Sequence, residues 1–192
     1  MNRRTKTVVL GSALLLAVGG ASAATASGSP SRQPEAVAVS EAPAPQREAA
    51  ALTGTAKLYR SDGDDITFSF DAHLAAKDTA VPMEATGTFE FSHYLNGKGA
   101  WAKARVDCLV TGGKVAVVSG IITDSDLPDA EGQRVGVTVQ DLGRHDRLGY
   151  SWMASGRPGE GNEPPKCASA APFEKVKKGT GDFKVVPWQP KL

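Results

Sequence analysis

Residues 66–74 read ITFSFDAHL, and this stretch decides the fold class because apolar and polar side chains alternate along its whole length. In an extended strand such alternation separates two faces. One face carries Ile66, Phe68, Phe70, Ala72 and Leu74, and the other carries Thr67, Ser69, Asp71 and His73. We therefore predict a strand with one face in a hydrophobic core and the other toward solvent.

The same pattern continues on both sides of this strand. Further strands are predicted over residues 54–59, 86–94, 101–110, 115–123, 133–140, 148–153 and 182–186. Turn signals separate them, among them the acidic segment 61–65 and Asn96-Gly97. No helix of useful length is evident. The prediction is an all-β domain over residues 51–192, a single antiparallel sandwich or barrel of about eight strands with one disulfide.

One predicted strand, residues 101–110, places small side chains toward the core. Its core face would carry Ala100, Ala102, Ala104, Val106, Cys108 and Val110, and its other face Trp101, Lys103, Arg105, Asp107 and Leu109.

The first 23 residues predict export. Arg3, Arg4 and Lys6 precede an apolar stretch over residues 8–20, and Ala21-Ser22-Ala23 supplies small residues for cleavage near Ala23. The stretch is shorter than the ~20 residues that span a bilayer. Secretion, into the medium or loosely associated with the wall, is expected. Arg3-Arg4 leaves a twin-arginine route open. Residues 24–50, rich in Ala, Pro and Ser, predict a disordered linker.

Charge favours no particular partner. The chain has 22 Lys and Arg against 21 Asp and Glu, and loss of the first 23 residues changes the net charge from +1 to −2. A near-neutral chain lacks the cationic field that steers proteins to nucleic acid, and no stable membrane insertion is expected.

Cys108 and Cys167 are the chain's two cysteines. In an exported chain they predict a disulfide, with a reactive free thiol or an intermolecular bridge as the alternative. Neither has a second cysteine within zinc-ligand spacing.

Three histidines are candidates for chemistry. Asp71 and His73 share a strand face, where they form either a solvated contact or a proton-transfer pair. His93 lies in a later predicted strand. His145 lies in Arg144-His145-Asp146-Arg147, which predicts local salt bridges and the capping of a turn, or a base oriented by Asp146.

Two further groups suggest ligands. Trp101, Lys103 and Arg105 share a face, with Tyr94 and Trp152 expected nearby, and such a mixture can stack on sugars or other planar ligands, or simply pack as core. Acidic loops at residues 62–65 and 124–131 suggest calcium or ordinary turns. The lysine-rich segment 173–192 suggests contact with anionic wall polymer, or a protected sheet edge.

Known catalytic and cofactor-binding motifs are missing from the sequence. It has no Gly-x-Ser-x-Gly, His-Glu-x-x-His, Cys-x-x-Cys or phosphate-binding glycine loop. We expect no cofactor and no metal. A dispersed catalytic triad stays open.

The predicted domain resembles small exported actinobacterial proteins that carry the label repetin. The resemblance rests on residues 63–73, 89–94, 101–113, 144–152, 178–183 and 186–188. It implies secretion and a shared fold, and it supplies no catalytic residue. The leading hypothesis is a non-enzymatic secreted domain that binds an envelope or extracellular component, such as a cell-wall polymer or carbohydrate. The alternative is an enzyme that uses Asp71, His73 and His145.

Overall fold

The computed structural model describes residues 48–158, 160 and 163–189, and these form nine strands and three short helical turns. The strands are β1 (Glu48–Lys57), β2 (Asp65–Ala75), β3 (Thr86–Leu95), β4 (Lys98–Gly112), β5 (Val115–Ser125), β6 (Arg134–Gln140), β7 (Arg147–Tyr150), β8 (Glu174–Lys175) and β9 (Asp182–Val186). The helical turns are η1 (Ala76–Asp78), η2 (Pro82–Glu84) and α1 (Trp152–Ser155).

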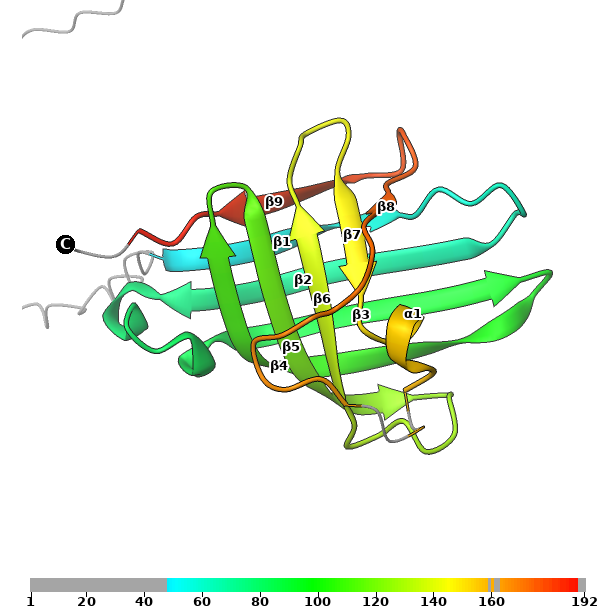
Figure 1. Ribbon diagram of the computed structural model, residues 1–192, viewed down its shortest axis with the longest axis horizontal. Coiled ribbons are helices and arrows are strands. Elements are labelled where there is room, and N and C mark those ends of the chain that lie inside the picture. Colours follow the sequence, from blue (N-terminus) through cyan, green and yellow to red (C-terminus); the bar gives the residue numbers. More distant parts are fainter. Residues whose placement is uncertain (1–47, 159, 161–162, 190–192) are drawn as a thin grey trace, which may run out of the picture. The chain divides into compact units, whose positions relative to one another are not determined.

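All nine strands belong to one antiparallel sheet in the order β8-β7-β6-β5-β4-β3-β2-β1-β9 (Figure 1). The sheet curls until its two ends meet. There an antiparallel bridge joins Leu58, just after β1, to Val176, just after β8. The predicted all-β class with one disulfide is confirmed, and the single curled sheet corresponds to the barrel alternative, partly closed, rather than to two separate sheets.

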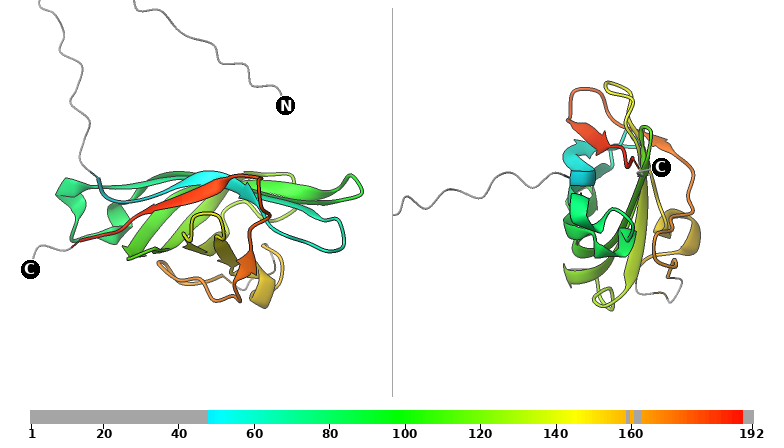
Figure 2. Two further views of the ribbon diagram at one scale, coloured as in Figure 1. Left: turned by 90° about the horizontal axis from the view of Figure 1, so that it is seen from above. Right: turned by 90° about the vertical axis from the view of Figure 1, so that its left-hand side faces the viewer.

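The curled sheet folds over itself as two layers around one core (Figure 2). The long strands β1, β2 and β3 lie beside β9 in one layer, and β5, β6 and β7 cross them in the other. β4 passes from the first layer into the second. The alternating residues of ITFSFDAHL occur as predicted, with Phe68, Phe70 and Leu74 buried between the layers.

A bulge at Asp107 overturns the predicted faces of β4. The pairing shifts between Val106 and Cys108, so Asp107 is an extra residue opposite β5. After an extra residue in a strand, side chains that would have pointed to one face of the sheet point to the other face. Leu109 therefore joins the core, Val110 is 38% exposed, and Cys108 lies on the outside of the layer under a covering loop.

Two strand limits in the structure also differ from the predicted ones. β1 begins at Glu48, within the predicted linker 24–50, and Ala50 is fully buried. The strand predicted over residues 148–153 ends at Tyr150, and the chain turns into α1 at Trp152.

The free edge of β9 is bound by carboxylates instead of by another strand. The backbone N–H of Phe183 donates to Asp146 Oδ2 at 2.8 Å, and that of Val185 donates to Asp141 Oδ2 at 3.2 Å. Asp146 is only 1% exposed. Burial raises the pKa of Asp146, and hydrogen bonds from the N–H groups of Phe183 and Leu142 lower it. The neighbouring Asp182 raises it again, so the pKa is raised overall. Asp146 caps the β6–β7 turn as predicted, since its Oδ1 accepts the Leu142 N–H at 2.7 Å, but its Oδ2 closes the sheet instead of forming a local salt bridge.

The predicted signal segment, residues 1–23, lies outside the described residues, as does the linker up to residue 47. Within the described part of the chain, no helix has the length and hydrophobicity needed to cross a bilayer.

Candidate functional site

A pocket opens where the β3–β4 hairpin meets α1 and the β5–β6 loop. It has a volume of about 370 Å³, within the roughly 300–1,000 Å³ typical of small-molecule sites. We call it the aromatic pocket. Its lining consists of Phe91, His93, Gly99, Ala100, Trp101, Ala102, Leu127, Trp152, Arg157 and Pro158.

The sequence of the hairpin explains why space remains there. Phe91 pairs with Ala102 across the strands, and His93 pairs with Ala100. Large side chains on β3 thus lie opposite alanines on β4, which do not fill the inner face. The extended hairpin supplies part of the pocket lining, and α1 contributes Trp152.

Trp152 reaches the pocket because β7 stops at Tyr150, and its ring forms one aromatic surface with that of Phe91. Its ring centroid lies 4.3 Å from that of Phe91 and 4.8 Å from that of Tyr150. Tilted aromatic pairs at such distances are favourable beyond their burial. The Trp152 ring is therefore held in place by the aromatic core while it lines the pocket.

A polar cluster fixes Tyr150 behind this ring. Arg60 donates from Nη2 to the Tyr150 hydroxyl at 3.0 Å, and its Nη1 lies 2.6 Å from Glu174 Oε2. Burial, followed by the charge of Glu174, raises the pKa of Tyr150. The neutral phenol is an anchor for the pocket wall.

Two polar side chains line the otherwise apolar pocket. His93 Nε2 lies 3.1 Å from Asp64 Oδ2, and Arg157 Nε donates to Glu160 Oε1 at 3.0 Å. Mostly apolar walls with a few polar groups are the usual composition of a ligand site. The arrangement can bury an apolar or ring-shaped body and hydrogen-bond a polar end.

The structure separates the three histidines that the sequence offered for chemistry. His73 lies on the outer face of β2 between two carboxylates, with Nε2 2.8 Å from Asp71 Oδ1 and Nδ1 2.6 Å from Glu48 Oε1. Partial burial lowers the pKa of His73, but the hydrogen bonds to Asp71 and Glu48 outweigh this and raise it overall. His93 lines the aromatic pocket, and His145 is exposed in the β6–β7 loop.

The predicted Trp101, Lys103 and Arg105 do share the outer face, opposite Ser92, Glu90 and Thr88 of β3. Lys103 forms an ion pair with Glu90 at 2.9 Å, and Arg105 is exposed. Trp101 also borders a shallow outer hollow of about 190 Å³, lined by Thr67, Ser69, Glu90, Phe91, Ser92 and Trp101. Of the expected neighbours, Trp152 joins Trp101 in the aromatic pocket, and Tyr94 lines neither hollow.

The acidic loops have partners within the protein. Asp65 pairs with Lys57 at 2.7 Å, Asp64 contacts His93, and Asp126 accepts the backbone N–H of Trp101 at 2.6 Å. Across the described residues, no group of three or more His, Cys, Asp or Glu side chains is placed to hold a metal ion.

The disulfide fastens a strap, residues 163–172, to the outside of the β5–β7 layer (Figure 1). Cys108 and Cys167 are joined with their Cα atoms 5.3 Å apart, which confirms the predicted pairing. The strap carbonyl of Ala168 lies so near Gly136 that a side chain there would come within 3.0 Å of it.

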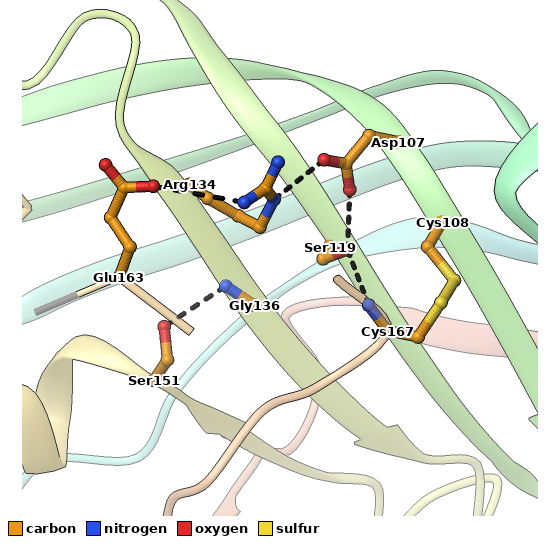
Figure 3. A network of polar contacts seen from close by, with 8 residues as sticks. All are labelled: Asp107, Cys108, Ser119, Arg134, Gly136, Ser151, Glu163 and Cys167. Atoms are coloured by element: carbon orange, nitrogen blue, oxygen red, sulfur yellow. Dashed lines mark hydrogen bonds and ion pairs between the residues drawn. A yellow bond between two sulfur atoms is a disulfide. The ribbon is translucent and has the colours of Figure 1, made fainter. Parts of the chain in front are cut away.

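A polar network lies beneath the strap (Figure 3). Ser119 Oγ donates to Asp107 Oδ1 at 2.6 Å and accepts the Cys167 N–H at 3.0 Å. Arg134 Nε donates to Asp107 Oδ2 at 2.8 Å. Because Ser119 is fully buried and has its partners here, we interpret the network as the attachment of the strap.

Sequence reasoning did not identify Phe91, Leu127 or Arg157 as site residues. Phe91 follows the core period of its strand, and Leu127 and Arg157 stand in loops. The one available signal was the tryptophan pair, since two of the chain's three tryptophans, Trp101 and Trp152, line the pocket.

Comparison with known proteins gives no match to a protein-family model, to a curated protein or to a solved structure. The resemblance to repetin-labelled proteins stays a prediction.

Proposed function

We propose that this chain is a non-enzymatic binding protein that works after export, and that its aromatic pocket binds the apolar or ring-shaped part of an extracellular small molecule. The observation that carries the proposal is the contact of the Phe91 and Trp152 rings beside about 370 Å³ of space, with Trp101, His93 and Arg157 also in the lining. Aromatic walls supply contact area, and the polar groups supply orientation.

Two observations support an extracellular setting. The sequence of residues 1–23 has the order of a secretory signal. The Cys108–Cys167 disulfide needs an oxidising compartment to persist.

The arrangement of the histidines favours binding over catalysis. An enzyme built on Asp71, His73 and His145 needs these side chains at one site. His73 is instead paired with Glu48 and Asp71 on a strand, and His145 belongs to an exposed loop.

A fluorescent probe tests the proposal. Anilinonaphthalene sulfonate combines apolar rings with an anionic group, so it should bind the purified protein with one saturable site. Ala100→Phe fills the pocket from β4 and should weaken binding roughly tenfold. Ala80→Phe, at an exposed position outside the pocket, is the matched control and should bind like the parent. Equal binding by both variants, with both folded by circular dichroism, would refute the proposal.

The outer hollow favours a second candidate function, which is carbohydrate binding. An indole beside hydroxyl and carboxylate groups is a set of contacts suited to a sugar ring. Trp101 supplies the indole, and Thr67, Ser69, Ser92 and Glu90 supply the polar groups. We therefore propose this hollow as the site that binds the predicted cell-wall polymer or carbohydrate partner.

Retention on isolated cell walls tests this second function, with oligomers of N-acetylglucosamine as soluble competitors. Ser92→Val removes a hydroxyl from the hollow, whereas Thr88→Val changes the same strand face outside it. Weaker retention of Ser92→Val than of Thr88→Val supports the idea. If walls retain both variants and the parent equally, the hollow is not the binding site.

A further inference from the structure

A second polar hollow lies where the β6–β7 loop meets the segment between β8 and β9. It has a volume of about 380 Å³ and is lined by Gly143, Arg144, Val176, Lys177, Lys178, Gly179, Gly181 and Asp182. We call it the basic hollow. Its residues come from two loops, one between β6 and β7 and one between β8 and β9, and from Asp182 at the start of β9.

Both loops are held by hydrogen bonds. The backbone N–H of Val176 donates to the carbonyl of Asp146 at 2.9 Å, which joins the two loops. Thr180 Oγ1 donates to the carbonyl of Lys177 at 2.7 Å and accepts the N–H of Lys57 at 3.1 Å. The hollow is therefore part of the folded seam of the sheet.

Positive charge dominates this hollow. Arg144, Lys177 and Lys178 line it against the one carboxylate of Asp182. Some basic side chains elsewhere have carboxylate partners, as in Lys57–Asp65 and Lys114–Asp141. In the part of the chain that the structure describes, no ion pair within 4.0 Å engages the three cations of the basic hollow.

Small residues leave room beside these cations. A side chain at Gly143 or Gly179 would meet nothing within 4 Å, so the space next to Arg144 and Lys178 is open. Guanidinium and ammonium groups around an open space are the usual ligands of phosphate in proteins.

We propose that the basic hollow binds a phosphate group of an extracellular ligand, with Arg144, Lys177 and Lys178 as its ligands. The site is separate from the aromatic pocket and does not depend on the function proposed for it. The shared chemistry is a phosphate oxyanion, which belongs either to a free phosphate monoester or to a phosphodiester unit of an anionic polymer.

Isothermal titration with inorganic phosphate, glycerol phosphate and a glycerol phosphodiester tests the site at constant ionic strength, with chloride as the reference anion. The double variant Lys177→Gln/Lys178→Gln should weaken binding roughly tenfold. The matched control Lys98→Gln/Lys166→Gln removes the same charge from exposed positions outside the hollow and should change affinity less than about twofold.

Asp182→Asn gives a test with the opposite sign. It removes the negative charge that faces the bound anion, so phosphate should bind several-fold more tightly. Binding of inorganic phosphate and glycerol phosphate without the diester identifies a free phosphate ligand, and comparable binding of the diester identifies a polymer unit. Equal losses in the two lysine double variants, or the absence of saturable binding in the folded parent, would overturn the proposal.

Discussion

Removing the Cys108–Cys167 cross-link should destabilise the protein measurably. The double variant Cys108→Ala/Cys167→Ala avoids burying a new hydroxyl at Cys108, which is fully buried. The bond closes a loop of 59 residues. In the chain-entropy description, opening a loop of this size lowers the free energy of unfolding by about 4 kcal/mol, because the unfolded chain gains freedom.

This free energy corresponds to a clear shift in melting temperature. For a domain of roughly 140 residues, each kcal/mol moves the midpoint by about 3–4 °C, which gives a decrease of about 13 °C. Circular dichroism at slow heating rates measures it. The hydrogen bond from Cys167 N–H to Ser119 Oγ remains in the variant, so the strap keeps one attachment.

Reduction provides the matched control. Dithiothreitol should lower the melting temperature of the parent to that of the double variant and leave the variant unchanged. A variant that melts within about 3 °C of the oxidised parent would show that the bond constrains the unfolded chain far less than its loop length requires.

Three further predictions concern the strap, the sheet seam and the outer face. Gly136→Ala places a Cβ against the Ala168 carbonyl and should cost about 2 kcal/mol in chemical unfolding, whereas Gly112→Ala, which meets nothing within 4 Å, is the control. Burial raises the pKa of Asp141, but hydrogen bonds from Lys114, Val185 and Gly143 outweigh this and lower the pKa below its usual 3.8. The Asp141 carboxylate therefore stabilises the fold above pH 3.8, and this stabilisation is lost as the pH falls through its lowered pKa. Asp141→Asn should therefore lose about 2 kcal/mol in urea unfolding at about pH 7 and much less at about pH 2 to 3, and an unchanged difference would contradict this. The pKa of His73 is raised above 6.5. The charged imidazole therefore contributes to the stability of the fold below pH 6.5, and this contribution is lost as the pH rises through the raised pKa. The melting temperature of His73→Gln should differ from that of the parent at about pH 6 and converge with it at about pH 9, and a pH-independent difference would argue against a charged imidazole.

Local pattern determined the strands of this protein. In ITFSFDAHL every second side chain is apolar, and an extended backbone turns this order into two faces without help from the rest of the chain. Turn residues marked most strand limits for the same local reason. The disulfide also followed from sequence, since the chain has two cysteines and its first residues predict export.

Distant contacts decided what the local pattern could not. The extra residue at Asp107 depends on how β4 pairs with β5, and it moved Leu109 into the core and Cys108 under the strap. Asp146, part of a charged run in the sequence, is buried because β9 arrives beside it and needs an acceptor for Phe183 N–H.

Two of the three proposed sites, the aromatic pocket and the basic hollow, have the same origin in the tertiary structure. The aromatic pocket joins Phe91 to Trp152, and the basic hollow joins Arg144 to Lys178. Alternation along a strand reports which face a side chain occupies. It carries no information on which segments meet when the sheet curls, because that depends on register, bulges and the closure of the two sheet ends.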